Sequence, residues 1–383
     1  MRIHLNQTIS NKYIPIKYQG HSSLNKLSAT NPQTENNAVT TLSPVNLAYY
    51  NITFGKNMDA DFLLKQSKHL KCAYSGKLML TKNEIKDIFQ KLEKRPNVQS
   101  AINLLTAYEK YMHDTELAIF SIIKDSKHKN KLNLQNILQE LQPDALKRLK
   151  EKQITIIKST DSYIENLSPA VADLVRLIRD NALAKIEDNT FGRQPPLEMI
   201  KAVKAKGQDA KIIMKIYQTW YKLPNSARDV DAFIVKYSRK PHIDIARRLI
   251  SPSMATIEHI VPTSRKKKNS NFLGNMILVS ARFNNDRKSM PLDEYIALNR
   301  DIDIPKHLQK YIDLVIREIN RPGSDFSLCG MYPERIRKAI AKETSGKINL
   351  KTDSLTLTKT QKKAIDASKK LSQKYVTSFE YEK

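Results

Sequence analysis

The sequence has few of the residues that mark specialised folds. Its 383 residues include only two cysteines, Cys72 and Cys329, too few for a disulfide framework or a four-cysteine zinc site. Nine glycines and sixteen prolines exclude a collagen-like or glycine-rich chain. No apolar run approaches the roughly 18 residues that a membrane-spanning helix needs, and the N-terminus lacks the apolar core of a secretion signal. We therefore expect a soluble protein of a reducing compartment, predict a cytoplasmic location, and expect no membrane partner.

Positive charge is what the sequence has in excess. Lys and Arg number 65 against 39 Asp and Glu, a formal net charge of +26. Residues 239–290 contain eleven basic and three acidic residues, and residues 334–383 contain thirteen and six, whereas residues 1–60 contain five and two. A field of this sign attracts polyanions, of which nucleic acid is the commonest inside cells. The alternatives are a lysine-rich solvated surface, common in AT-rich genomes, and binding to anionic lipid.

Composition and hydrophobic spacing divide the chain into four parts. Residues 1–57, rich in Ser, Thr, Asn and Gln, predict a flexible polar arm. Residues 58–188 predict a helical bundle. Residues 189–330 predict a domain with helical flanks around a core at 255–298, where the chemistry of the chain is concentrated. Residues 331–383 predict a basic helical tail.

The helical prediction rests on apolar residues that recur three or four positions apart. Ile85, Ile88 and Leu92 are one such stripe, which predicts an amphipathic helix packed into a core. Pro143 is expected to break or restart a helix, because proline lacks a backbone N–H. Trp220 lies in a helical apolar stripe and is interpreted as a core residue rather than a surface for stacking bases.

The core segment has the pattern strand, basic loop, strand, helix. ATIEHIVP alternates polar and β-branched residues and ends at a proline, NMILVS is a second apolar run, and RFNNDRKSMPLDEYIAL has helical character. Glu258 and His259 end the first predicted strand, Asn275 opens the second, and Asn284 and Asn285 open the helix. A carboxylate, an imidazole and amide groups are therefore expected in one ββα unit.

These residues resemble the motif of the HNH (ββα-metal) endonucleases. EHIVP-S, then GN-x-x-L, then N-x-x-x-K follow one another at intervals similar to those in the HNH domains of RNA-guided CRISPR nucleases and modification-dependent restriction enzymes. The resemblance covers about an eighth of the chain, and we recognise no family for the helical N-terminal two thirds. Together with the helical spacing upstream, it predicts a mostly α-helical protein: a helical N-terminal region plus a small C-terminal ββα-metal (HNH) module.

The resemblance also implies a role for each polar residue. His259 is the general base, Asn275 orients it and ties the hairpin together, and Glu258 is a metal ligand. The other metal ligand is Asn284 by its spacing from Asn275, or Asn285 when aligned backward from the basic residues that follow. Carboxylate and amide oxygens suit one divalent ion, Mg²⁺ or Mn²⁺, and a neutral imidazole accepts a proton at cellular pH.

Basic residues flank the motif on both sides. They are predicted to bind backbone phosphates without reading sequence, and they are Arg265, Lys266, Lys267, Lys268, Arg287, Lys288, Arg247 and Arg248. For Arg247 and Arg248 a solvent-facing role is an equal alternative. His242, close to the motif, is interpreted as a helix cap or surface residue rather than a substrate contact.

The sequence therefore predicts a metal-dependent HNH endonuclease that hydrolyses phosphodiester bonds in DNA, with RNA left open as a substrate. One alternative is a non-catalytic nucleic-acid-binding protein with a vestigial HNH fold. Another is a toxin or effector nuclease delivered to a second cell. The helical region is expected to select the target or to contact a protein partner, as in restriction or anti-phage defence systems.

Overall fold

Helices make up most of the structure. The computed structural model describes residues 60–95, 97–125, 133–262, 264, 275–321 and 333–352. The N-terminal elements of this part are α2 (Ala60–Gln66), α3 (Lys82–Glu93), α4 (Val98–Thr106), η1 (Glu109–Tyr111), α5 (Asp114–Lys124), α6 (Leu134–Lys158), α7 (Asp161–Ile164), α8 (Pro169–Glu187), α9 (Gln194–Ala202) and α10 (Gly207–Trp220). They are followed by α11 (Val230–Tyr237), α12 (His242–Ile250), η3 (Ser251–Ser253), β1 (Ala255–His259), β2 (Met276–Ser280), α13 (Ala281–Arg287), α14 (Leu292–Leu298), α15 (Ile304–Asn320) and α16 (Pro333–Glu343). No helix among the described residues is long and apolar enough to span a membrane.

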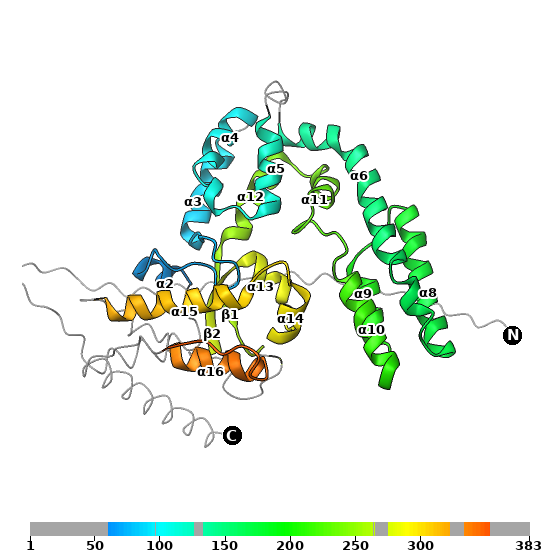
Figure 1. Ribbon diagram of the computed structural model, residues 1–383. Coiled ribbons are helices and arrows are strands. Elements are labelled where there is room, and N and C mark those ends of the chain that lie inside the picture. Colours follow the sequence, from blue (N-terminus) through cyan, green and yellow to red (C-terminus); the bar gives the residue numbers. More distant parts are fainter. Residues whose placement is uncertain are drawn as a thin grey trace, which may run out of the picture. The chain divides into compact units, whose positions relative to one another are not determined.

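The two strands and α13 form the expected ββα unit (Figure 1). β1 and β2 are antiparallel, and their register pairs Ala255 with Ser280 and His259 with Met276. α13 follows β2 directly, so the mostly α-helical fold with a small ββα module is confirmed. One detail differs from the prediction. Asn284 lies inside α13 instead of opening it, because the helix already begins after Ser280, which is its N-cap residue.

A segment far upstream completes the edge of this hairpin. The N–H of Ala255 donates to the carbonyl of Leu80 at 2.8 Å, and the N–H of Leu80 donates to the carbonyl of Ser253 at 3.0 Å. The N–H of Ala73 donates to the carbonyl of Leu278 at 2.9 Å. The ββα unit is therefore built from two stretches of sequence, and the upstream stretch follows α2 directly.

Buried apolar side chains form three clusters. The first combines α2 and the upstream segment with the hairpin, α13, α14, α15 and α16. The second combines α3, α4, α5 and the first half of α6 with α11 and α12, and the third combines the second half of α6 with α7 to α10. These clusters do not follow the predicted boundary between residues 188 and 189. Spacing identifies an apolar stripe but not its partner, and α11 and α12 share a core cluster with α3 to α6.

α6 runs without interruption from Leu134 to Lys158, so the predicted break at Pro143 is wrong. Pro143 and Gln139, whose carbonyl loses its helical donor, are both exposed, and water can satisfy that carbonyl. Leu138 and Ala145, on either side of the proline, are fully buried in one cluster. Packing therefore holds both halves of the helix in line and offsets the lost hydrogen bond.

Other local predictions are confirmed. α3 buries Ile85 and Leu92, and its first turn is closed by a capping box on Thr81. Trp220 is fully buried, and its indole N–H donates to the hydroxyl of Thr160 at 3.1 Å. The only tryptophan of the chain is therefore a core residue, as its position in an apolar stripe indicates.

His113 lies between α5 and α13 and is only 2% exposed. Its ring packs edge-on against Phe283 of α13, with 5.5 Å between ring centroids. Burial, with help from the cations Arg282 and Lys77, lowers the pKa of His113 from 6.5 to about 3. The folded protein therefore holds this imidazole neutral, whereas the unfolded chain protonates it below pH 6.5.

A histidine with a depressed pKa stabilises the fold above its unfolded pKa, and this contribution is lost as the pH falls toward 3. Between pH 7 and pH 5, His113 should cost the wild-type protein up to about 2 kcal/mol of unfolding free energy. Urea unfolding of His113→Gln should lack this loss. The exposed His69→Gln is the control and should keep the wild-type pH dependence. An identical pH dependence in all three proteins would contradict the assignment.

Candidate active site

Glu258 and His259 end β1 on opposite faces of the hairpin, because neighbouring side chains alternate along a strand. Thr256 and Glu258 face α13, as their hydrogen bonds to that helix show. Glu258 is 3% exposed, whereas His259 is half-buried. The carboxylate therefore lies in the interior, and the imidazole is only partly enclosed, with its Nε2 buried.

A buried ion pair joins α13 to β1. Nη1 of Arg287, the last residue of α13, donates to Oε1 of Glu258 at 2.7 Å and to the hydroxyl of Tyr74 at 3.0 Å. The Arg287 side chain is fully enclosed, and that of Glu258 is 4% exposed. This corrects the prediction that Arg287 binds phosphate, since protein atoms surround its guanidinium group.

The same arginine holds the backbone on both sides of the site. Nη1 and Nη2 donate to the carbonyls of His259 and Ile260 at 2.8 and 2.5 Å, and Nε donates to the carbonyl of Met290 at 3.0 Å. Three carbonyls, a carboxylate and a hydroxyl thus surround one buried cation, which balances the cost of removing it from water. The position of the His259 backbone depends directly on this group.

Glu258 has one oxygen to spare. Burial raises its pKa to about 7 even though the neighbouring Arg287 lowers it. Oε2 is buried and accepts no hydrogen bond within the described part of the chain. An orphaned buried carboxylate oxygen is a suitable ligand for a cation, although Arg287 already supplies one positive charge to this carboxylate.

Asn275 bridges the two ends of the loop that joins β1 to β2. Its Nδ2 donates to the carbonyl of Val261 at 3.0 Å, and its Oδ1 accepts from the N–H of the same residue at 2.8 Å. Its backbone carbonyl accepts from the N–H of Ile260 at 2.8 Å. Asn275 is 3% exposed. The side-chain amide and the backbone carbonyl of one buried residue therefore hold the two residues that follow His259.

The two candidate asparagines of α13 differ in environment. Nδ2 of Asn284 donates to the carbonyl of Ile257 and the hydroxyl of Thr256, both at 3.1 Å. Asn284 is half-buried against β1, whereas Asn285 is exposed. Because its nitrogen is held by the strand, Asn284 keeps its Oδ1 for another partner. Of the two residues, Asn284 is the one that belongs to the hairpin–helix contact.

Residues 237–291 match the family model described as HNH endonuclease. This segment is an HNH-family domain. The resemblance seen in the sequence is thereby confirmed, and an HNH domain indicates a nuclease-type function with nucleic-acid binding. No curated protein and no solved structure matches the chain. The matched segment contains β1, β2 and α13 but neither Tyr74 nor α15.

The HNH domain offers few ligands for a metal ion. Among the residues that the structure describes, no three His, Cys, Asp or Glu side chains come together as a metal site. Oε2 of Glu258 and Oδ1 of Asn284 are oxygen donors on the α13 side of β1. They suit a hard cation such as Mg²⁺, which usually keeps several waters and binds substrate phosphate as well. The donor set therefore fits such an ion in kind.

The basic residues of α12 are engaged with other side chains. Arg248 donates from Nη1 to Oε1 of Glu116 at 2.7 Å, and Glu116 is fully buried. This structural ion pair corrects the prediction that Arg248 binds phosphate. Arg247 forms an ion pair with Glu93 and lies over the ring of Phe89, 5.3 Å from its centroid. Arg247 stays partly exposed, so its contact with phosphate stays a prediction.

The remaining predicted contacts have mixed outcomes. Lys288 is exposed just after α13. The basic run at residues 265–268 lies outside the described residues. Nδ1 of His242 accepts from the N–H of Leu134 at 2.9 Å, so His242 caps the start of α6. The capping interpretation of His242 is therefore confirmed, although the helix that it caps is not its own.

The sequence did not predict the role of Tyr74 or the other contacts that hold α13. Tyr74 and Arg287 are separated by 213 positions, and no local pattern links them. Asp286 pairs with Arg228 and accepts from the hydroxyl of Tyr295 at 3.1 Å. The one local signal is the helical spacing of charged residues in RFNNDRK, which indicates that α13 makes polar contacts.

Arg287→Met should strongly destabilise the fold, by about 3–5 kcal/mol, because it leaves Glu258 and several carbonyls buried without their cation. Lys288→Met, the adjacent exposed residue, is the matched control and should cost less than about 0.5 kcal/mol. Adding Glu258→Leu to Arg287→Met should recover part of the loss. Urea unfolding monitored by circular dichroism measures all four proteins. Equal stabilities of Arg287→Met and Lys288→Met would refute the role of the buried ion pair.

Proposed function

We propose that this chain is a metal-dependent endonuclease that hydrolyses phosphodiester bonds in DNA, with His259 as the general base. The observation that carries the proposal is the pair of hydrogen bonds between Asn275 and Val261. They support a fixed backbone directly after His259, which a positioned base requires. An imidazole can accept a proton at cellular pH, and that of His259 is half-buried, with its Nε2 in the interior.

Glu258 and Asn284 are the residues that we expect to hold one divalent cation, Mg²⁺ or Mn²⁺. When bound, the cation would neutralise charge on the phosphate and the leaving oxygen. Glu258 can offer Oε2 while Oε1 stays with Arg287. Asn284 can offer Oδ1 while Nδ2 stays with β1. Neither ligand needs to break its observed hydrogen bonds.

The choice of a nucleic-acid substrate rests on the net charge of +26 and on the HNH-family match. DNA, rather than RNA, follows from the resemblance to DNA-cutting HNH domains. Lys288, Arg247 and the run at 265–268 are proposed to bind backbone phosphates. The helical region formed by α3 to α12 is proposed to select the target or a protein partner, as in a defence system.

The base is tested by cleavage of supercoiled plasmid with Mg²⁺ or Mn²⁺. His259→Ala should lower the rate at least about 100-fold, since general-base catalysis contributes roughly 10²–10⁴-fold. EDTA should abolish the wild-type activity. His259→Ala should still bind the plasmid with an affinity within about twofold of wild type, which separates loss of chemistry from loss of binding. Undiminished cleavage by His259→Ala would rule out this residue as the base.

The Glu258–Arg287 ion pair favours one alternative, a nucleic-acid-binding protein with a vestigial HNH fold. An arginine that balances the carboxylate in the absence of metal is what a domain retained only for binding would also need. The two functions separate in the same plasmid experiment. Salt-sensitive binding without cleavage, with either metal, would support the vestigial domain.

The metal ligand on α13 is tested by titrating Mn²⁺ in the cleavage reaction. Asn284→Ala should raise the half-saturating concentration at least about tenfold, and the exposed Asn285→Ala should change it less than twofold. Asn284→Asp distinguishes a ligand from a structural contact. An aspartate supplies an oxygen but cannot donate to Ile257 and Thr256, so a ligand role predicts that it keeps the low Mn²⁺ requirement. Behaviour like Asn284→Ala would contradict that role.

A further inference from the structure

A basic groove lies between α15 and the turn that precedes α3. It has a volume of about 290 Å³ and is lined by the turn residues Lys71, Cys72 and Gly76 and by the exposed face of α15, chiefly His307, Lys310 and Arg317. We call it the α15 groove. Gly76 has φ of +64°, and a Cβ at this position would lie 2.7 Å from Nδ1 of His307, so the turn approaches the helix as closely as backbone allows.

The cations of the α15 groove form no ion pair with the acidic side chains that the structure describes. Lys71, Lys310 and Arg317 form no ion pair within the described part of the chain. Asp313, the single acidic residue of the lining, accepts a hydrogen bond from Nε2 of Gln309 at 2.8 Å. Burial and then the charge of Lys310 lower the pKa of His307, as expected in a positive field.

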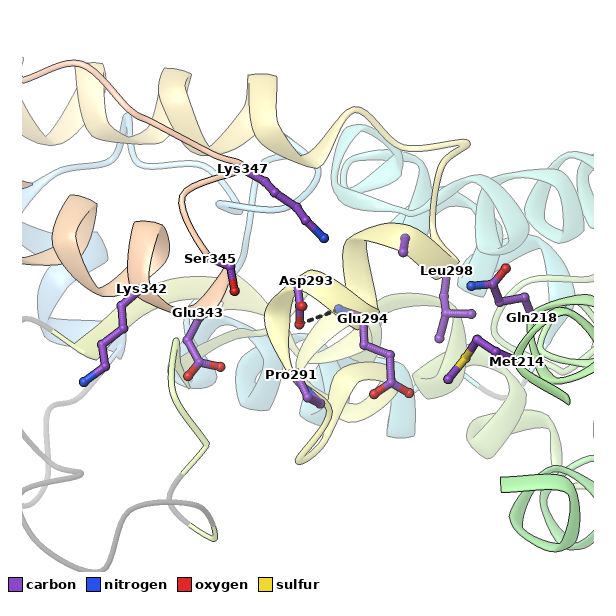
Figure 2. Close-up of a pocket in the computed structure, with 11 residues that line it drawn as sticks. Met214, Gln218, Pro291, Asp293, Glu294, Leu298, Lys342, Glu343, Ser345 and Lys347 are labelled. Carbon is purple, nitrogen blue, oxygen red and sulfur yellow. Dashed lines mark hydrogen bonds between the residues drawn. The ribbon is translucent and has the colours of Figure 1, made fainter. Parts of the chain in front are cut away.

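These free cations contrast with the basic residues near the motif. Arg287 and Arg248 are held by buried carboxylates. The hollow beside α14 in Figure 2 is more acidic than the α15 groove. It is lined by the carboxylates of Asp293, Glu294 and Glu343 and by only two lysines. Of these two hollows, the α15 groove is the one whose charge suits a polyanion.

The groove is long enough for a nucleic-acid backbone. Lys310 and Arg317 lie seven residues apart on α15, about 10 Å at a rise of about 1.5 Å per residue. One strand of a DNA duplex advances about 3.4 Å along the helix axis per phosphate, so the groove is long enough to meet more than one phosphate. A second hollow of about 720 Å³ shares Asp313 and Arg317 with the groove and continues to Arg321, which pairs with Glu318 at 3.4 Å. A small anion would fill only part of this length.

α15 is attached directly to the catalytic hairpin. The hydroxyl of Tyr311 accepts from the N–H of Leu278 in β2 at 3.1 Å. Tyr311 also lines the groove, together with Cys72, whose sulfur accepts from the N–H of Ser280 at 3.4 Å. The groove is therefore lined by residues that contact the middle and the C-terminal end of β2.

We propose that the α15 groove binds the sugar–phosphate backbone of the DNA substrate outside the matched HNH segment. This inference rests on the proposed function only for the identity of the substrate. Lys71, Lys310 and Arg317 are its phosphate contacts. They add affinity that is independent of sequence and sensitive to salt, and they take no part in the chemistry.

The test compares two double charge reversals that change net charge equally. Lys310→Glu with Arg317→Glu reverses two positive charges of the groove. The control is Lys185→Glu with Lys211→Glu, at exposed positions of α8 and α10. The probe is a fluorescent DNA duplex in EDTA, so that binding is measured without cleavage. At about 0.1 M salt the groove variant should bind about tenfold or more weakly, whereas the control should stay within about twofold of wild type. The slope of log affinity against log salt should fall by about 1.8 in the groove variant alone.

Equal affinities and slopes for the two double variants would overturn the proposal, as would wild-type binding that does not depend on salt. Binding to vesicles of anionic lipid is measured in parallel. A greater loss of vesicle binding than of DNA binding in the groove variant would also overturn the proposal. If the charge reversal does not fold, Lys310→Gln with Arg317→Gln gives the same slope measurement. The proposed function is tested separately. If the protein binds DNA through the groove but never cleaves plasmid, the groove proposal stands and the nuclease proposal fails.

Discussion

The buried guanidinium of Arg287 is the group on which the HNH unit depends. A charge in the interior is tolerated only when its partners nearly surround it, and these partners come from three places: Glu258 and two carbonyls from β1 and the residues after it, Met290 from the turn after α13, and Tyr74 from the upstream segment. A shift of any one of these elements would leave polar atoms buried without partners. The ion pair therefore fixes relative positions more than it adds stability, and the backbone of His259 is among the positions that it fixes.

α13 is also tied to the helical part of the chain. Arg282 lies 3.7 Å from the buried carboxylate of Glu116, which Arg248 also contacts, and Asp286 pairs with Arg228 after α10. Three charged side chains of one short helix thus contact α5, the residues after α10, and β1. Substitutions in the helical region can therefore alter the candidate site without any contact to substrate. This coupling between the helical region and the site requires no conformational change, because a buried charge that loses its partner destabilises the whole contact.

Local patterns in the sequence predict what depends on neighbouring residues. The apolar stripe of α3, the buried Trp220 and the strand–strand–helix order all follow from periodicity, and all are present. Long-range contacts decide the rest. Pro143 continues a helix because packing holds both sides of it, and Arg287 is buried because Tyr74, far away in the sequence, helps to enclose it. A sequence can indicate that an arginine lies at the end of a helix, but it does not show whether that arginine faces solvent or a carboxylate.

The same limit applies to the net charge. A count of +26 indicates a polyanionic partner but does not say which cations would meet it. A cation paired with a buried carboxylate contributes little to an external field, since the carboxylate cancels its charge at short range. Arg248 and Arg287 fall in this class, whereas Lys71, Lys310 and Arg317 do not. Candidate phosphate contacts in a basic protein are therefore better chosen by the absence of an ion pair with a buried carboxylate than by closeness to the motif in the sequence. By that criterion the proposed interface includes α15, which the family match does not include.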